Sequence, residues 1–413
     1  MKLRLSLLTI AVAAFSLSVS SGAIPGPNPA TDPLVLISID GFRWDYLDKY
    51  EAPVLRQLAT DGVRARRMKP SFPSKTFPNH YTLVTGLRPE HHGIVSNSFF
   101  DPAFNETFSM GKKESNTESR WWGGEPVWIT AEKQGVRSAC FFWPGSEMEN
   151  HGLRPTYYQP FNGKLSSAAR VDGLLAWLDL PAETRPRFLT LYFDVVDHAG
   201  HTFGPDAPQT ALAVKQVDDA IGRLLAGLSA RGLAGKTNFV IVADHGMASC
   251  GPDQIVFLED LMDVGSVQVE STGPNGGVRP KTGMAADLVA TIRAKKSPHV
   301  QVYLREEVPA RLHYRDNPRI PPVVLIADEH WNIESKVGWP MRAPTYNKGS
   351  HGWDPELPDM GALFLASGPA FRHGVILDPF DNIHVYNLLC ATLGLTPAPN
   401  DGDQTLVQSV LQR

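Results

Sequence analysis

Three aspartates stand at the ends of apolar runs that are typical of strands buried on both faces: Asp40, Asp197 and Asp244. In an open α/β sheet, ligands bind beyond the carboxyl ends of the strands, so we expect one site to collect all three. Three close carboxylates repel each other unless cations neutralise them. The pattern therefore indicates a site for divalent cations, although a single aspartate at a strand end is more often a turn or helix-cap residue.

Histidines accompany these carboxylates. His245 adjoins Asp244, and His201 follows Asp197 by four positions, which is one turn if the segment is helical. His351 lies between glycines in an expected loop. Such oxygen and nitrogen donors suit zinc, with manganese or iron as alternatives. Four further histidines are weaker candidates for metal ligands: His80, His91, His92 and His198.

Thr76 is a candidate nucleophile. Pro78 can open a helix at its first turn, which places Thr76 just before the helix N-terminus. Free N–H groups and the helix dipole favour a phosphate there. A threonine hydroxyl is a poor nucleophile at neutral pH, but a metal ion can lower its pKa. This segment alone favours the simpler interpretation that Thr76 only caps the helix.

The elements that position these residues alternate between strand and helix. Apolar runs cover residues 33–40, 187–197 and 238–244, and helical patterns cover residues 52–61, 127–134, 168–178 and 207–231. This alternation predicts an α/β fold, with a mostly parallel central sheet and helices on both faces. Residues 255–342 are less regular and are interpreted as a small inserted subdomain. We expect residues 24–413 to form one large domain around that insert.

Composition narrows the class of protein. The 413 residues include 42% hydrophobic and 20% charged residues, with a formal net charge of −4, which argues against disorder. No basic run beyond residues 64–69 indicates nucleic acid as a docking partner. Three cysteines beside 13 histidines exclude a disulfide scaffold and a Cys-ligated zinc module.

The first 23 residues have the pattern of a secretory signal peptide. Lys2 and Arg4 precede an apolar stretch from Leu5 to Val19, and small residues follow. A retained N-terminal anchor is the alternative. No later stretch reaches the length of a membrane span, so we expect an exported protein, periplasmic or secreted.

Several motifs together resemble the nucleotide pyrophosphatase/phosphodiesterase family of the alkaline phosphatase superfamily. The resemblance extends from about Leu34 to Gln412, and no Cys-x-Pro-x-Arg segment of the sulfatase type is present. The chain looks like a bacterial member that consists of the catalytic domain alone. The matching segments are Lys75–Tyr81, Thr85–Glu90, His92–Val95, Asp197–His201, Asp244–Met247, His351–Asp354, Tyr386–Cys390 and Thr396–Asn400.

By this resemblance, the fold is alkaline phosphatase-like and two zinc ions serve as cofactors. Thr76 would be the nucleophile and would form a phospho-threonine intermediate, while Asn97 would donate a hydrogen bond to a phosphate oxygen. The two sets of zinc ligands that the resemblance implies are Asp40, Thr76, Asp244 and His245 for one ion, and Asp197, His201 and His351 for the other.

The same resemblance implies the substrate. Nucleotide-cleaving relatives carry the stretch that spans residues 141–163 here, whereas a lysophospholipase relative lacks most of it. Phe77 and Phe161 fall where relatives enclose the nucleobase between aromatic rings, and Glu147 replaces a common Asp. Stacking tolerates any base, so we expect nucleotide diesters and pyrophosphates to be hydrolysed to nucleoside 5′-monophosphates with broad base specificity.

Two alternative functions stay open from the sequence. A choline-type glycerophosphodiesterase or lysophospholipase would use the same fold, and a non-catalytic zinc-binding protein would retain the ligands without turnover.

Two cysteines match positions that look paired in animal relatives, so the resemblance also implies a Cys250–Cys390 disulfide with Cys140 free. The oligomeric state does not follow from the sequence.

Overall fold

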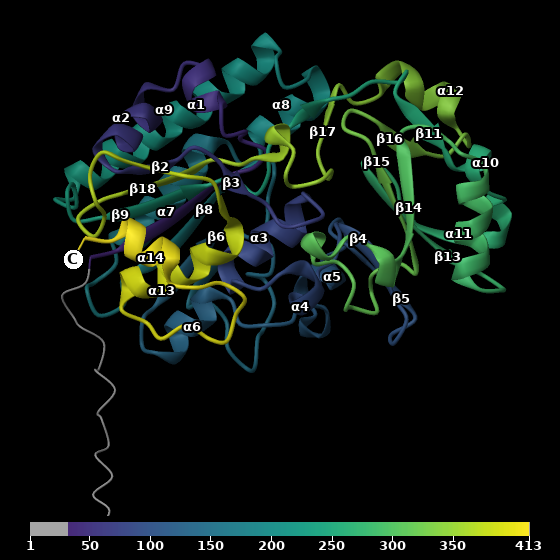
Figure 1. The fold of residues 1–413 in the computed structure, drawn as a ribbon. Helices are drawn as coiled ribbons and strands as arrows, with labels where there is room; N and C mark the ends of the chain where they lie inside the picture. The colour runs from purple at the N-terminus through teal and green to yellow at the C-terminus, as the bar shows by residue number, and fades with distance from the viewer. Residues whose placement is uncertain (1–31, 413) are drawn as a thin grey trace, which may run out of the picture.

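The computed structural model describes residues 32–412, and the predicted signal peptide at residues 1–23 lies outside them. An eight-stranded sheet forms the centre of the larger of two lobes (Figure 1). Its strands lie in the order β19 (Val375–Leu377), β2 (Val63–Ala65), β18 (Phe364–Ser367), β9 (Asn238–Val242), β1 (Leu34–Ile39), β8 (Phe188–Phe193), β6 (Ser138–Phe141) and β7 (Tyr157–Gln159).

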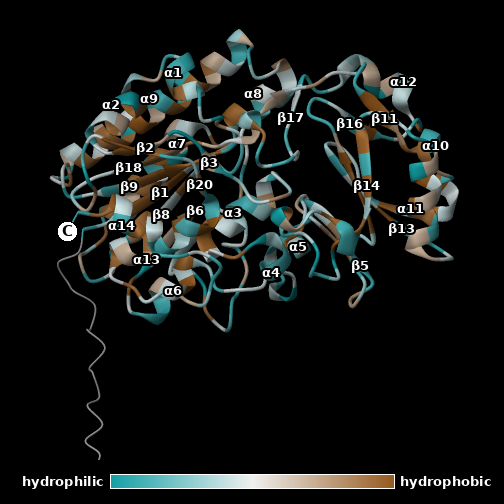
Figure 2. Cartoon of the chain, in the orientation of Figure 1, coloured by the Kyte–Doolittle hydropathy of each residue, from teal (hydrophilic) through white to brown (hydrophobic). Residues whose placement is uncertain are grey.

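The middle of this sheet is parallel and buried on both faces. Strand β1 pairs in parallel with β8 and β9, and all six of its residues are buried, which explains its apolar run without alternation. Only β18 runs antiparallel to its neighbours in this sheet. The prediction of a mostly parallel sheet is therefore confirmed. Figure 2 shows the apolar residues concentrated on these strands.

Helices cover both faces of the sheet (Figure 1). One layer contains α2 (Pro53–Asp61), α7 (Ser167–Leu178), α8 (Val195–Phe203) and α9 (Pro208–Ala230), which contact one another through α9. The other contains α3 (Thr76–Thr85), α6 (Val127–Lys133), α13 (Val385–Leu393) and α14 (Thr405–Val410), which pack around α13. The four helices predicted from sequence patterns match α2, α6, α7 and α9 to within one residue at each end.

Residues 255–342 carry a second sheet, which is antiparallel and has its own hydrophobic cluster. Its strands are β12 (Val267–Ser271), β13 (Asn275–Pro280), β15 (Val323–Ala327) and β14 (Val300–Leu304), with α11 (Ala285–Ala294) packed against them. Strands β11 (Ile255–Phe257) and β16 (Asn332–Glu334) pair beside it, near α10 (Leu258–Leu261) and α12 (Trp339–Arg342). This segment is the smaller lobe in Figure 1.

Short elements complete the fold. They are α1 (Tyr46–Lys49), α4 (Pro89–His92), α5 (Lys113–Thr117), and the strand pairs β3 (Met68–Lys69) with β20 (Phe380–Asp381), β4 (Ser98–Asp101) with β5 (Glu106–Ser109), and β10 (Ala248–Ser249) with β17 (Gly349–Ser350). Arg319 of the smaller lobe forms contacts with the larger lobe. Its guanidinium donates to the carboxylate of Asp101 and to the carbonyl oxygens of Gly93 and Trp121. No helix within residues 32–412 is both long and apolar enough to span a bilayer.

The implied Cys250–Cys390 disulfide is wrong. All three cysteines, which lie within the described residues, are free and buried. Cys390 lies on α13 in the main core, whereas Cys250 follows β10 and belongs to a separate small cluster with Trp353 and Met360. The Cys250 thiol instead donates to the carbonyl oxygen of Asn347. The two thiols occupy different packing environments, so a bond between them would require one to leave its own.

Candidate active site

The first group of metal-type donors lies at the carboxyl edge of the central sheet. Asp40 directly follows β1, and Asp244 and His245 come two and three residues after the neighbouring strand β9. His245 Nε2 lies 2.9 Å from Asp244 Oδ2 and 3.5 Å from Asp40 Oδ1. His245 Nδ1 donates to the carbonyl oxygen of Gly246, which leaves Nε2 as the atom that faces the carboxylates.

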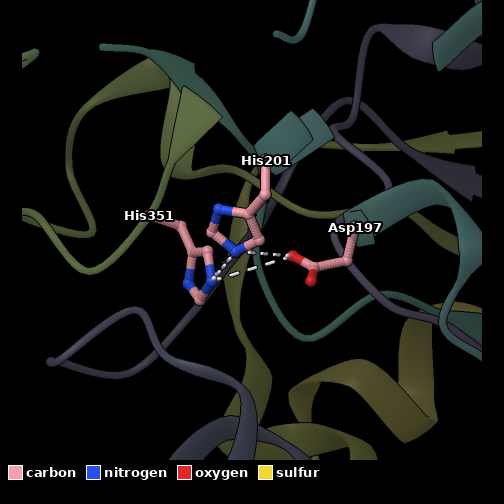
Figure 3. Close-up of side chains that lie close together, drawn as sticks. All are labelled: Asp197, His201 and His351. Atoms are coloured by element: carbon pink, nitrogen blue, oxygen red, sulfur yellow. Dashed lines mark hydrogen bonds and ion pairs between the residues drawn. The ribbon is translucent and has the colours of Figure 1, made fainter. Parts of the chain in front are cut away.

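The second group consists of Asp197, His201 and His351 (Figure 3). Asp197 lies in the first turn of α8 and not at a strand end as the sequence suggested, because β8 already ends at Phe193. His201 Nε2 lies one helical turn away, 3.4 Å from Asp197 Oδ1. His351 arrives from the loop after β17, with Nε2 at 3.7 Å from the same oxygen.

The two groups adjoin, and the Thr76 hydroxyl lies beside them. The rings of His245 and His351 stack with centroids 3.5 Å apart. Thr76 Oγ1 lies 3.3 Å from His245 Nε2. Helix α3 begins at Thr76 itself, not two residues later as Pro78 suggested, and its N-cap is Lys75 without any side-chain cap. The Thr76 side chain therefore faces the donor groups and does not cap its own helix.

Unpartnered atoms in both groups fit cations. Asp40 Oδ1 and Asp197 Oδ1 are buried and make no hydrogen bond to any described residue. His201 Nδ1 and His351 Nδ1 both donate to backbone carbonyl oxygens, so their two Nε2 lone pairs face each other at 3.1 Å. Lone pairs at this distance repel unless a cation lies between them. The donor set of carboxylates and imidazoles suits zinc.

The pKa directions agree with that reading. Burial raises the pKa of Asp40 well above its usual range, and the nearby Asp244 and Asp197 carboxylates raise it further. Burial lowers the pKa of His351 well below its ordinary value, and the neighbouring His245 and His201 add to this effect. Without cations, Asp40 therefore favours a bound proton and His351 stays neutral, while the Asp244 carboxylate raises the pKa of His245 against the effect of burial.

Tyr192 supports the first group from β8. Its hydroxyl donates to Asp40 Oδ2 at 2.6 Å, and both side chains are buried. No sequence pattern singled out Tyr192. Its signal was its position on a strand whose carboxyl end leads into the Asp197 segment.

A cavity of about 300 Å³ opens beside Thr76. Its walls combine aromatic rings with carboxylates, as in many small-molecule sites. Phe77 and Phe161 both line it, so the structure brings together the two rings that the sequence proposed as a base clamp. Residues of the same cavity that no sequence pattern assigned to the site include Met110, Asn116, Trp143 and Asp194.

Two polar side chains hold the aromatic residues in place. The amide oxygen of Asn97 accepts the backbone N–H of Phe77 at 2.9 Å, so the Asn97 NH₂ group must point elsewhere as a donor. The Glu147 carboxylate accepts the backbone N–H of Phe161 at 3.0 Å. Phe161 is 55% exposed, so part of this residue is accessible to a ligand.

The four weaker histidine candidates belong to neither donor group among the described residues. His80 Nδ1 contacts the carbonyl oxygen of Thr76, and its Nε2 contacts the Ser38 hydroxyl, so it braces the start of α3. His91 Nδ1 contacts the carboxylate of Asp401. His92 is fully buried, and its Nε2 contacts the hydroxyl of Thr82 on α3. His198 is exposed at the rim of the cavity.

Comparisons with known proteins agree with this geometry. Residues 34–354 match the sequence profile of the family described as type I phosphodiesterase / nucleotide pyrophosphatase. An uncharacterized pyrophosphatase/phosphodiesterase of Schizosaccharomyces pombe is 40% identical over 387 residues, which cover 91% of this chain and 80% of that protein. Human ectonucleotide pyrophosphatase/phosphodiesterase family member 1 is 38% identical over 92% of this chain.

A venom phosphodiesterase of Macrovipera lebetinus is also 38% identical, again over 92% of this chain. This chain spans 42% of the human protein and 45% of the venom protein, so both relatives are more than twice as long as the shared part. Among solved structures, murine ectonucleotide pyrophosphatase/phosphodiesterase 5, an inactive variant in complex with AMP, superposes with a TM-score of 0.86 at 34% identity. The match covers 92% of this chain and 100% of that one. On the family profile, the identities and the shared fold, the chain belongs to the type I phosphodiesterase / nucleotide pyrophosphatase family.

Proposed function

We propose that this chain is an exported two-zinc hydrolase that cleaves nucleotide phosphodiesters and pyrophosphates to nucleoside 5′-monophosphates. One observation carries the proposal: the Thr76 hydroxyl lies between the two donor groups and an aromatic-lined cavity. The family, and a structural relative described in complex with AMP, support nucleotides as the substrate class.

Asp40, Thr76, Asp244 and His245 would hold one cation, and Asp197, His201 and His351 would hold the second. When bound, two such cations neutralise the carboxylates, make the Thr76 hydroxyl more acidic and stabilise the negative charge of the leaving oxygen. The buried oxygens without partners in both groups support this assignment.

In this mechanism, the Thr76 hydroxyl gives its proton to solvent and Oγ1 forms a bond to phosphorus. The bond between phosphorus and the leaving oxygen breaks, and the leaving group departs as an alkoxide or as pyrophosphate. A phospho-threonine results, and water then hydrolyses it to release the nucleoside monophosphate and restore the hydroxyl. Thr76 lies at the N-terminus of α3, where the helix dipole and free N–H groups favour the phosphoryl group.

Asn97 completes the phosphate site. Its amide oxygen is bound to the Phe77 N–H, so the NH₂ group is free to donate to a non-bridging phosphate oxygen. The same contact orients Phe77, which would stack on one face of the base while Phe161 covers the other. Stacking accepts every base, so we expect broad base specificity.

Thr76→Ala tests the nucleophile. We expect it to abolish hydrolysis of nitrophenyl thymidine monophosphate while zinc stays bound, and Thr76→Ser, which keeps a hydroxyl, to retain part of the activity. Metal analysis should find two zinc ions per active chain, and a chelator should remove activity. Retained turnover in Thr76→Ala would refute the nucleophile assignment.

A parallel assay with nitrophenyl phosphocholine separates the nucleotide reading from a choline-type diesterase on the same fold. We expect the thymidine ester to be strongly preferred, because the family and the structural relative described in complex with AMP support nucleotides, and Phe77 and Phe161 offer rings to a planar base. Preference for the choline ester would overturn the proposed substrate class. Export is tested separately by fractionating cells that express the full chain, since the predicted signal peptide lies outside the described residues.

A further inference from the structure

The mechanism above does not use Asp194, although its carboxylate lines the cavity beside Thr76. Asp194 is the N-cap residue of α8, but its side chain makes no capping hydrogen bond. A carboxylate without a capping role in a site for anionic substrates requires an explanation, since it would repel a phosphate close to it.

Arg170 holds this carboxylate in place. Arg170 Nη2 lies 2.9 Å from Asp194 Oδ1, and the Arg170 side chain is only 2% exposed. The same guanidinium donates to the carbonyl oxygens of Tyr192 and Leu165 and packs over the Phe142 ring. Arg170 is therefore itself fixed, and it fixes one oxygen of Asp194.

The other oxygen, Oδ2, makes no hydrogen bond to a described residue and borders the space that Gly163 leaves open. A Cβ at Gly163 would lie 3.5 Å from Phe161 Cζ and 3.8 Å from Asp194 Oδ2, so ring and carboxylate face the same space. On its other side, Asp194 lies one helical turn before Asp197. Asp194 thus lies between the base-stacking ring and the donor groups at the phosphate site.

In a nucleotide, the sugar lies between base and phosphate, and its hydroxyls are neutral donors that a carboxylate accepts without repulsion. We propose that Asp194 accepts a hydrogen bond from the 2′- or 3′-hydroxyl of the ribose and so gives the enzyme a preference for nucleotides that carry this hydroxyl. This inference rests on the proposed function, because it requires a nucleotide in the cavity. Asp194 acts on substrate recognition and not on the bond that breaks.

The test compares ATP with 2′-deoxy-ATP and 3′-deoxy-ATP, which share one base, by AMP or deoxy-AMP release. A hydrogen bond to a charged acceptor is worth about 10-fold or more in kcat/KM, so wild type should prefer ATP by about 10-fold over at least one deoxy substrate. Asp194→Ala should bring this ratio close to one by slowing ATP alone. Asp194→Asn, which keeps a partner for Arg170, should give an intermediate ratio.

Methyl nitrophenyl phosphate, a diester without nucleoside, reports whether the catalytic groups are intact, and its hydrolysis should be the same in all variants. Asp172→Asn is the matched control, since Asp172 also pairs with an arginine but is exposed on α7. Equal use of all three nucleotides by wild type, or an unchanged ratio in Asp194→Ala, would overturn the inference. So would a change in preference between ATP and UTP with an unchanged sugar ratio, which would assign Asp194 to the base. If wild type cleaves only the nucleoside-free diester, the proposed function itself fails, and this inference fails with it.

Discussion

The contact between Tyr192 and Asp40 offers a sharp test of the first cation site. Tyr192→Phe removes one oxygen and keeps the ring that packs near Phe161. The lost hydrogen bond is short, buried and made to a carboxylate, so it belongs among the stronger ones. The other oxygen of Asp40, Oδ1, has no hydrogen-bond partner among the described residues. Tyr192→Phe would therefore remove the only side-chain hydrogen-bond donor to the Asp40 carboxylate.

The hydroxyl of Tyr192 lowers the pKa of Asp40 against the burial that raises it. Its removal therefore raises that pKa further, and a proton competes better with zinc for the carboxylate. Hydrogen bonds to charged groups are worth about 1.5–3 kcal/mol, and loss of such an outer partner costs about 10–100-fold in metal affinity. We expect zinc affinity at this site to fall by about 30-fold, with a larger loss at pH 6 than at pH 8.

Zinc affinity is measured by competition with a chromogenic chelator, and kcat/KM with nitrophenyl thymidine monophosphate at saturating zinc. Tyr50→Phe is the matched control, because its hydroxyl also makes a 2.6 Å hydrogen bond, but to the carbonyl oxygen of Pro205 outside the site. Tyr50→Phe should leave zinc affinity unchanged. Zinc affinity within twofold of wild type in folded Tyr192→Phe, at both pH values, would refute the reasoning.

Two further predictions concern stability and the thiols. Burial lowers the pKa of His92 to about 3, so the unfolded chain binds a proton below pH 6.5 that the folded chain does not, and stability falls as the pH drops from 6.5 towards 3. Between pH 6.5 and 5 this proton uptake lowers the free energy of unfolding by about 2 kcal/mol. Urea unfolding of His92→Gln should therefore show a smaller loss of stability over that range than wild type. An equal dependence of stability on pH in both proteins would contradict the lowered pKa of His92. A thiol titration in denaturant without reductant should find three free thiols per chain, and a count of one would restore the disulfide between two of Cys140, Cys250 and Cys390.

Much of the fold could be predicted from local patterns. Strand β1 is apolar at nearly every position because both its faces are buried, and helices such as α9 carry a clear apolar face. The same patterns located Asp40 and Asp244 at one edge, since β1 and β9 are parallel neighbours. The Asp197–His201 pair also followed from sequence, because a spacing of four in a helix is one turn.

What sequence patterns alone determined, then, is the α/β layering, the carboxyl-edge aspartates and the helical pair, all of which depend on residues close together in the chain. The family resemblance implied that His351 joins His201, and the tertiary structure brings these residues together from 150 positions apart. The tertiary structure alone decided that Tyr192 bonds Asp40, and that Cys250 and Cys390 lie in separate clusters. It also placed Asp194 in the cavity and began α3 at Thr76. Such contacts join segments that are distant in sequence, and their geometry is set by how whole layers pack, which no local period of hydrophobicity encodes.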